Sequence, residues 1–274
     1  MDGDAGIGTR FEMSDPRAGG LKRLGGTPCR LLFMADPEAL AGAAARLFMD
    51  RAEKAVQERG QFWVAVSGGA TPRPAYRLLA QEPYGSSRVW DRTHLFWVDE
   101  RCVPKTDPAS NWGTAQKDLL DRVPIPGAQI HPMPGTLPPE QGARHYEEIL
   151  AAFFHLKPGD LPRFDLILLG VGGDGHIASL FPGQNVLNET ERRVAAVKGG
   201  APDVWRLTMT LPVLNHAREL LFLVSGERKR DMIIRLFRGE PSGLPVERIH
   251  PVTGALTWVL DGAAASGLPQ RGGR

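Results

Sequence analysis

The chain has 274 residues, 33 Lys and Arg against 31 Asp and Glu, 42% hydrophobic residues and two cysteines. The balanced charge gives no overall field toward nucleic acid or a membrane surface, and no apolar run approaches the roughly 20 residues of a transmembrane helix. Cys29 and Cys102 have neither zinc-finger nor redox-motif spacing, which favours a reducing, cytoplasmic location. We therefore expect a globular protein that binds any anionic ligand locally.

Strand and helix patterns alternate along the chain. Continuous apolar runs predict buried strands at residues 30–35, 62–66, 95–98, 164–169, 206–210, 220–224 and 255–260, with a short strand near Ile130. Helical spacing predicts helices between the N-cap Asp36 and the stop Gly60, and over residues 111–122, 139–154 and 229–237. Strands that are apolar on both faces indicate a mostly parallel sheet between helical layers.

The domain organisation that we expect is simple. Neither a low-complexity linker nor an internal repeat divides the chain, so residues 28–265 should form a single α/β domain, a mostly parallel twisted sheet with helices on both faces. Residues 1–27 are rich in glycine and charge and lack the apolar core of a secretory signal, which predicts a flexible N-terminal extension. Residues 266–274 are glycine-rich and predict a frayed tail.

Polar segments follow several of the predicted strands. VAVSGGATP places Ser67, Gly68, Gly69 and Thr71 between a strand and a helix start, where open backbone N–H groups and hydroxyls favour a phosphate. The same segment is also common in turns without a ligand, and it lacks the G-K-[ST] of a Walker A loop.

The segment WVDERCVP sets Asp99, Glu100 and Arg101 at the end of the next strand, where a parallel sheet gathers its ligands. A salt-bridged loop edge would explain such charges equally well. Asn111, soon afterwards, could contact substrate or cap the following helix, and Ser110 is the other candidate for the cap.

The most informative segment is FDLILLGVGGDGHIASLFPG, residues 164–183, in which a strand runs into a glycine-rich turn with Asp174 and His176. A histidine suits proton transfer near neutral pH, and this one lies at a strand end beside a carboxylate. The six other histidines have no such setting. The remaining candidate cations are Lys198, Arg206 and Lys229, each of which could also be a solvated surface charge.

Gly170, Gly172 and Gly175 spell G-x-G-x-x-G, which raises the alternative of an NAD(P)-dependent oxidoreductase. A dinucleotide fingerprint needs a sustained helix after its glycines and an acidic residue at the end of the next strand. Pro182 interrupts the helix almost at once, and Glu191 precedes the strand VAAV instead of ending it. The pattern therefore argues against a dinucleotide site.

Six segments together resemble the 6-phosphogluconolactonase branch of the glucosamine-6-phosphate isomerase/6-phosphogluconolactonase superfamily, over about residues 30–260: SGGATP, DERCVP, SNWGTA, LLGVGGDGHIASLFPG, RLTMTLPVLNHA and SGERKR. The resemblance implies one α/β domain, related to sugar-phosphate isomerase folds, that hydrolyses 6-phospho-D-glucono-1,5-lactone to 6-phospho-D-gluconate in the oxidative pentose phosphate pathway. We expect no metal and no cofactor. The only partner that we expect is the sugar-phosphate lactone, and the protein should be a monomer or a weak homo-oligomer.

The roles that we expect follow from lactone chemistry and the matching positions. His176 would deprotonate a water and then protonate the leaving ring oxygen, with Asp174 orienting it. Arg101 and Lys198, the matching cationic positions of the family, would stabilise the oxyanion. The candidates for holding the substrate and its phosphate are Ser67, Gly68, Gly69, Thr71, Asp99, Asn111, Arg206 and Lys229.

Two alternatives remain within the same fold. Amino-sugar-phosphate deaminases resemble GHIAFNEP after the histidine, with a glutamate that serves ring opening, whereas this chain continues HIASLFP without it. A non-catalytic sugar-phosphate-binding regulator should lack the histidine and the arginine, and both are present here. The sequence therefore favours ester hydrolysis.

Overall fold

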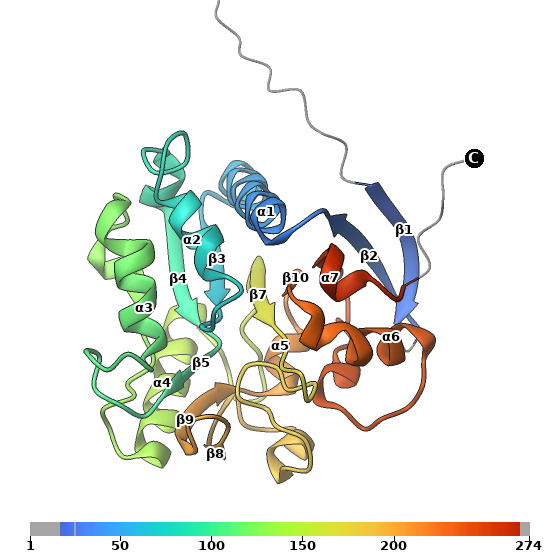
Figure 1. Cartoon of the computed structure of the whole chain (residues 1–274). Helices are drawn as coiled ribbons and strands as arrows, with labels where there is room; N and C mark the ends of the chain where they lie inside the picture. Colours follow the sequence, from blue (N-terminus) through green and yellow to red (C-terminus); the bar gives the residue numbers. More distant parts are fainter. Residues whose placement is uncertain (1–16, 25, 269–274) are drawn as a thin grey trace, which may run out of the picture.

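The computed structural model of the chain describes residues 17–24 and 26–268. Its strands form an eight-stranded sheet in the order β1-β2-β11-β10-β7-β3-β4-β6 and a three-stranded sheet in the order β5-β9-β8 (Figure 1). The strands are β1 Arg17–Leu24, β2 Thr27–Met34, β3 Phe62–Val66, β4 Thr93–Trp97, β5 Asp99–Arg101, β6 Ile130–His131, β7 Leu166–Gly170, β8 Val194–Gly199, β9 Val204–Met209, β10 Glu219–Val224 and β11 Ala255–Asp261.

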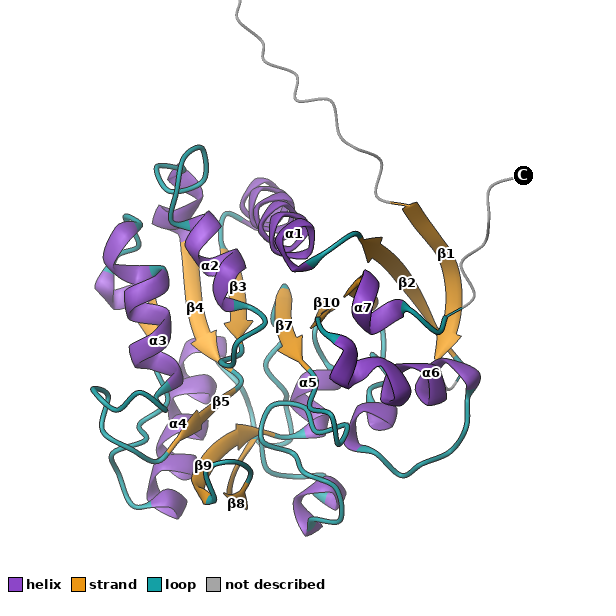
Figure 2. Cartoon of the chain, in the orientation of Figure 1, coloured by secondary structure: helices purple, strands orange, loops and turns teal. Residues whose placement is uncertain are grey.

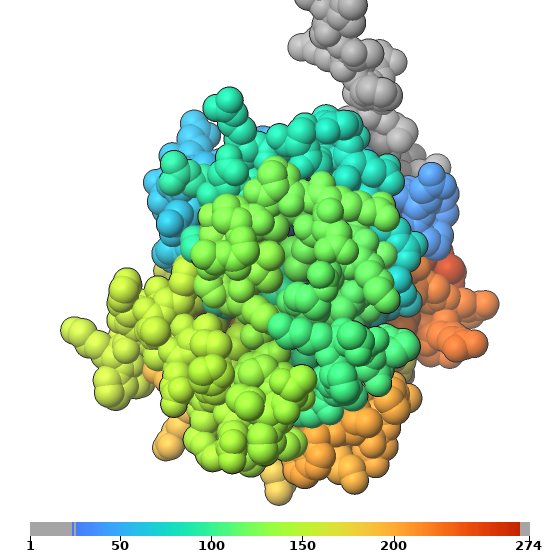
Figure 3. All heavy atoms as spheres, turned by 90° about the vertical axis from the view of Figure 1, so that its left-hand side faces the viewer, coloured from blue at the N-terminus to red at the C-terminus, as the bar shows by residue number. Residues whose placement is uncertain are grey.

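Neighbouring strands of the large sheet run parallel, apart from the antiparallel pair β1 and β2. The α-helices are α1 Pro37–Arg59, α2 Arg73–Leu79, α3 Asn111–Asp118, α4 Pro139–Phe154, α5 Leu211–Asn215, α6 Arg230–Arg238 and α7 Gly262–Ala265. Figure 2 shows the helices packed around the sheet, and Figure 3 shows the side covered by α3 and the segments after it, in green. Within the described residues, no helix has the length and apolar character needed to cross a bilayer.

Helices cover both faces of the sheet. Successive residues of a strand point to opposite faces, so neighbouring residues of β3 show which helix covers which face. In β3, Phe62 packs edge-on against Phe48 of α1 at 5.4 Å between ring centroids. The next residue, Trp63, packs against Phe154 of α4 at 5.2 Å. Helices α1 and α4 therefore lie on opposite faces, which confirms the predicted α/β fold.

The predicted elements are found with small shifts at their ends. Helix α1 begins at Pro37, where the Asp36 side chain accepts a hydrogen bond from Ala39 N at 2.8 Å, and it ends at Gly60, whose φ is 77°. Both residues act as the sequence predicts, the first as N-cap and the second as left-handed stop. Helix α4 and strand β3 match their predicted bounds.

Three features differ from the expectations. Residues 17–24, part of the predicted flexible extension, form edge strand β1; residues 1–16 lie outside the described part. Leu268, in the predicted frayed tail, is buried, while residues 269–274 are not described. Strand β5 follows β4 closely but does not belong to the large sheet: Asp99–Arg101 pairs antiparallel with β9.

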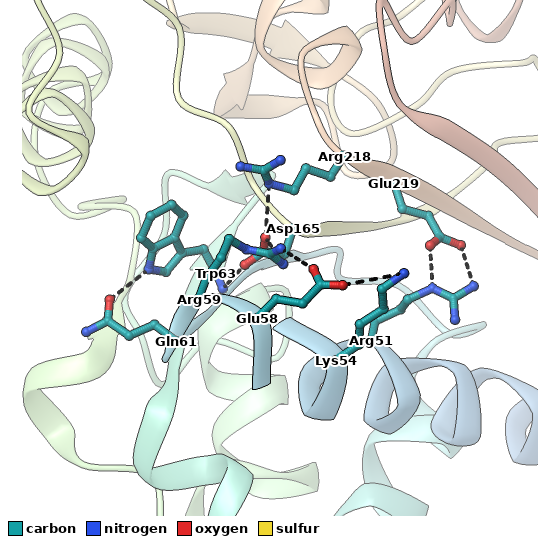
Figure 4. A network of polar contacts seen from close by, with 9 residues as sticks. All are labelled: Arg51, Lys54, Glu58, Arg59, Gln61, Trp63, Asp165, Arg218 and Glu219. Atoms are coloured by element: carbon teal, nitrogen blue, oxygen red, sulfur yellow. Dashed lines mark hydrogen bonds and ion pairs between the residues drawn. The ribbon is translucent and has the colours of Figure 1, made fainter. Parts of the chain in front are cut away.

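An ion-pair network joins the amino ends of three parallel strands (Figure 4). The buried carboxylate of Asp165, just before β7, contacts Arg59 at 2.8 Å and Arg218 at 3.2 Å and accepts a hydrogen bond from Trp63 N at 2.9 Å. Burial raises the pKa of Asp165, opposed by the Trp63 N–H and the two arginines. The network fixes the end of α1 and the start of β10 against β3.

Replacing Asp165 with Ala should lower the free energy of unfolding by about 2–3 kcal/mol, because two guanidinium groups and a backbone N–H lose their shared acceptor. Glu58→Ala is the control. It removes a half-exposed carboxylate that also pairs with Arg59, and such pairs contribute less than about 1 kcal/mol. Urea unfolding of both variants measures the difference; equal losses would contradict the prediction.

A pair of histidines predicts a loss of stability in acid. His94 Nδ1 and His131 Nε2 lie 3.2 Å apart, and burial, followed by the charge of His94, lowers the pKa of His131 to about 4. Because the unfolded value is about 6.5, protonation favours the unfolded chain. The free energy of unfolding should therefore fall as the pH drops from about 6.5 to about 4, and less steeply in His131→Asn. Parallel pH profiles of the two proteins would contradict this.

Candidate active site

A cavity opens at the carboxyl end of the parallel strands. It has a volume of about 670 Å³, within the range typical of small-molecule sites. Segments that follow β3, β4, β7 and β10 meet there, as expected for ligand sites of parallel sheets. The lining residues are Ser67, Gly68, Gly69, Ala70, Thr71, Pro72, Asp99, Arg101, Asn111, Gly170, Val171, Gly172, His176, Ala178, Arg206, Ser225, Gly226, Glu227, Arg228 and Lys229.

His176 is held by Asp174, which lies behind it and outside the cavity lining. The two side chains join through Nδ1 and Oδ1 at 2.6 Å. Partial burial raises the pKa of Asp174, but the hydrogen bond and charge of His176 outweigh this and hold that pKa below its usual value. An ionised carboxylate can only accept, so Nδ1 carries a hydrogen and Nε2 of the neutral ring has a free lone pair.

A tight turn after β7 presents this pair. Gly172 N donates to His176 O at 2.8 Å, and Gly175, at φ 75°, has the left-handed backbone that glycine favours. A Cβ on Gly172 would lie 2.1 Å from His176 Nδ1 and 2.3 Å from Asp174 Oδ1. The glycines of this turn therefore make room for side chains, and no sustained helix follows them, as the sequence indicated.

The floor of the cavity is a buried polar cluster around Asp99. Ser179 Oγ donates to Asp99 Oδ2 at 2.7 Å, and Asn111 Nδ2 donates to Asp99 O at 2.8 Å. Asn111 also lies so close to Gly68 that a Cβ there would be 1.8 Å from its Oδ1. Asn111 thus joins the segment after β4 to the loop after β3. Sequence reasoning missed Ser179, although it stands in the motif that identified His176.

The neighbours of Asn111 serve the backbone. Ser110 is the N-cap of α3, with Oγ accepting from Gly113 N at 3.0 Å. Glu100 turns away from the cavity: its carboxylate accepts hydrogen bonds from the backbone N–H groups of Arg101, Asn111 and Trp112. Glu100 is therefore a scaffold residue beside Asp99 and Arg101, which line the cavity.

Two arginines enter the cavity from the small sheet. Arg206 is 4% exposed and donates through Nε to Gly199 O at 2.7 Å, while Arg101 donates through Nη1 to Ala109 O at 2.5 Å. Arg101 and Arg206 are paired residues of strands β5 and β9, and burial and then the charge of Arg101 lower the pKa of Arg206. The Phe181 ring packs between Arg206 and the His176 ring, at 5.5 Å and 4.9 Å.

Lys198, expected beside Arg101, lies outside this cavity. It pairs with Trp205 in the β8–β9 ladder, and the next residue, Arg206, points to the opposite face of the strand. Its side chain is 55% exposed, with Nζ 3.9 Å from Asp203 Oδ2, and it lines a second cavity of about 680 Å³. Strand alternation thus places Arg206 in the cavity, as expected for a substrate-binding residue, and keeps Lys198, expected to stabilise the oxyanion, out of it.

The loop after β3 lines the cavity with residues 67–72. The Ser67 hydroxyl donates to Leu168 O at 2.8 Å, so its one hydrogen is already used inside the protein. Tyr76 Oη donates to Ser67 O at 2.7 Å and fixes the same residue. Gly68, Gly69 and Thr71 remain at the cavity. Half-buried Lys229, in the segment after β10, lines the same cavity, and burial lowers its pKa.

These features define an α/β protein in which a histidine, joined to a carboxylate, and several cations line one cavity at the carboxyl edge of the sheet. Within the described residues, no group of three or more His, Cys, Asp or Glu could hold a metal ion. The profile of the family Glucosamine-6-phosphate isomerases/6-phosphogluconolactonase matches residues 35–258, and the chain belongs to this family.

Individual relatives agree with this membership. The chain is 45% identical over 222 residues to a 6-phosphogluconolactonase of Synechocystis sp., and the matched region covers 80% of this chain and 89% of the relative. It is 38% identical over 243 residues to that of Rattus norvegicus, covering 87% and 93%. The solved 6-phosphogluconolactonase of Trypanosoma brucei is 27% identical, with a TM-score of 0.80 over 89% of this chain and all of that one. A monomeric glucosamine-6-phosphate deaminase, 22% identical with a TM-score of 0.72, shares the fold.

Gly172→Ala should displace the His176 ring and break its bond to Asp174, because the added methyl group would occupy their space. Overpacking of this kind costs about 1–3 kcal/mol of stability. Gly173→Ala is the matched control, since its Cβ would meet only Arg228 O at 3.7 Å. Crystal structures and unfolding curves of the two variants test this; an intact Asp174–His176 pair in Gly172→Ala would refute it.

Proposed function

We propose that the chain hydrolyses 6-phospho-D-glucono-1,5-lactone to 6-phospho-D-gluconate, the lactone step of the oxidative pentose phosphate pathway. The observation that carries the proposal is His176, which is joined to Asp174 at 2.6 Å and lines one cavity with Arg101 and Arg206. Relatives named 6-phosphogluconolactonase, at 38–45% identity, support the choice of substrate.

Hydrolysis proceeds by general base and then general acid catalysis. His176 Nε2 takes a proton from water as the water oxygen forms a bond to C1 of the lactone. The tetrahedral intermediate then expels the ring oxygen, which takes the proton back from His176. Asp174 holds Nδ1–H throughout and stabilises the imidazolium form, so one residue serves both steps.

The arginines stabilise the charge that develops on the carbonyl oxygen. Arg101 was expected there, and Arg206 replaces Lys198 as the second cation because it lies in the cavity and Lys198 does not. Preorganised donors of this kind contribute about 3 kcal/mol each to the transition state. Both guanidinium groups are already anchored to backbone carbonyls, so little reorganisation is needed.

The 6-phosphate binds between the loop after β3 and Lys229. Backbone N–H groups of Gly68 and Gly69, the Thr71 hydroxyl and the Lys229 ammonium group are its donors, while Ser67 shapes the loop through its bonds to Leu168 and Tyr76. Asp99 and Asn111 form the floor beneath the sugar. Fixing the phosphate orients C1 toward His176.

We expect the protein to act in the cytoplasm as a monomer or weak homo-oligomer. The unpatterned spacing of Cys29 and Cys102 supports a reducing compartment. Light scattering at several protein concentrations tests the oligomeric state.

His176→Asn should lower kcat for 6-phosphogluconolactone by about 10²–10⁴-fold, because the base and acid are both lost. His155→Asn is the control: His155 ends α4 in a left-handed conformation that Asn tolerates, and it should retain wild-type turnover. The assay uses enzymatically generated lactone with spontaneous hydrolysis subtracted. Near-wild-type turnover by folded His176→Asn would exclude it as the base.

Amino-sugar deamination is the alternative to exclude, since a deaminase shares the fold. In this chain the position where the resemblance places the deaminase glutamate is filled by Phe181, packed on His176. Ammonia release from glucosamine 6-phosphate should therefore be absent under conditions in which the lactone is hydrolysed. Ammonia release without lactone hydrolysis would reverse the assignment.

A further inference from the structure

One wall of the cavity is held by a buried carboxylate that lies outside the cavity lining. Asp261, the last residue of β11, is 0% exposed. It accepts hydrogen bonds from Ser225 Oγ at 2.5 Å, from Gly226 N at 3.0 Å and from Ala264 N at 2.8 Å. Two of the three donors belong to the turn after β10, and both of those residues line the cavity.

The parallel register of the last two strands brings this carboxylate to the turn. Val224 pairs with Leu260, so Ser225 and Asp261 are the next residues of the two strands, side by side where the pairing ends. Gly226 then takes a left-handed φ of 94°, which lets its N–H reach the carboxylate. The same turn continues to Lys229, whose N–H donates to Gly226 O at 3.1 Å.

The turn also packs against the segment that carries the histidine. Lys229 is half-buried, and the charge of Asp174 raises its pKa in opposition to the larger effect of burial. Gly173 faces Arg228 O across the same contact, at 3.7 Å from the position of a Cβ. A displacement of the turn would therefore move the Lys229 ammonium group relative to the proposed phosphate site.

We propose that Asp261 is a positioning residue for substrate binding: it fixes the Ser225–Gly226 turn and thereby holds Lys229 against the 6-phosphate. This inference rests on the proposed function for the identity of the ligand. Asp261 does not touch substrate itself. Its effect reaches the ligand through Lys229 and should therefore appear in binding of the phosphate, with little effect on the chemical step.

A purely structural role gives a different expectation. Asp261 is also the N-cap of α7, and loss of the cap alone would reduce the fraction of folded protein. Such a loss lowers the turnover of every substrate alike and leaves KM unchanged. A positioning role raises KM selectively for a phosphorylated substrate, so the two roles can be separated by kinetics.

The test compares Asp261→Asn, Lys229→Ala and the double variant on 6-phosphogluconolactone and on unphosphorylated gluconolactone. Asp261→Asn removes the charge and presents an N–H₂ group to existing donors. It should raise KM for the phosphorylated lactone about tenfold, as expected for loss of roughly one charged hydrogen bond, and change kcat less than about threefold. The KM and kcat of Asp261→Asn for unphosphorylated gluconolactone should stay near the wild-type values. The double variant should match Lys229→Ala alone, because both changes act through one group.

Ser225→Ala gives a second, milder variant if Asp261→Asn does not fold. It removes one of the bonds to the carboxylate and should raise the same KM by a smaller factor. Ser266→Ala is the control: its hydroxyl, at the other end of α7, donates to Ala263 O, and its loss should leave KM unchanged. Equal effects on both lactones, or additive effects of Asp261→Asn and Lys229→Ala, would overturn the inference.

A separate measurement distinguishes this inference from the proposed function. Calorimetric titration with inorganic phosphate should show weaker binding to Asp261→Asn than to wild type, whether or not the wild type hydrolyses the lactone. If wild type has no lactonase activity but this difference is found, the proposed function fails and the positioning role stands. Equal phosphate binding by the two proteins, or none by either, overturns the positioning role.

Discussion

Parallel pairing of β3, β4, β7, β10 and β11 is the constraint on which the rest of the structure depends. Parallel strands place all their carboxyl ends at one edge, so the segments after them meet although they are far apart in the sequence. The opposite edge carries the Asp165 network, which joins β3, β7 and β10 at their starts. The amino ends of β3, β7 and β10 thus fix the alignment of these strands, and the carboxyl ends of the parallel strands supply the residues of the candidate site.

The second requirement of the site is that several of its side chains lie very close to glycine residues. The side chains of Asn111, His176 and Arg206 each lie where a Cβ on a nearby glycine would clash, at Gly68, Gly172 and Gly200 respectively. Only Gly172 of these three belongs to the G-x-G-x-x-G pattern. In a dinucleotide fingerprint the glycines admit a pyrophosphate, whereas here Gly172 admits the side chains of Asp174 and His176 and Gly175 supplies the left-handed turn.

Much of the fold follows from local patterns, and the remainder depends on pairing between distant segments. Apolar runs and caps such as Asp36 and Gly60 identified the elements of the large sheet except β1, and polar residues at strand ends identified about half of the residues that line the cavity. The small sheet was not foreseen, because its strand β5 is short and charged. Lys198 and Arg206 could be assigned to opposite faces only after the β8–β9 register was known. The local sequence marks Asp261 only as the N-cap of α7, since its other partners, Gly226 and Ser225, lie 35 and 36 residues away.

The acidic and basic groups in and around the cavity have different roles. Asp174, Glu100 and Asp261 accept hydrogen bonds from the protein's own donors, and Asp99 accepts from Ser179 and Asn111. The cations Arg101, Arg206, Arg228 and Lys229 line the cavity, where only Asp99 and Glu227 oppose them. A chain with a net charge of only +2 can in this way present a locally positive site to a dianionic phosphate. We therefore expect the acids to set the geometry of the site and the cations to contact the proposed ligand, so that a neutral replacement of Asp261 changes the site by moving Lys229.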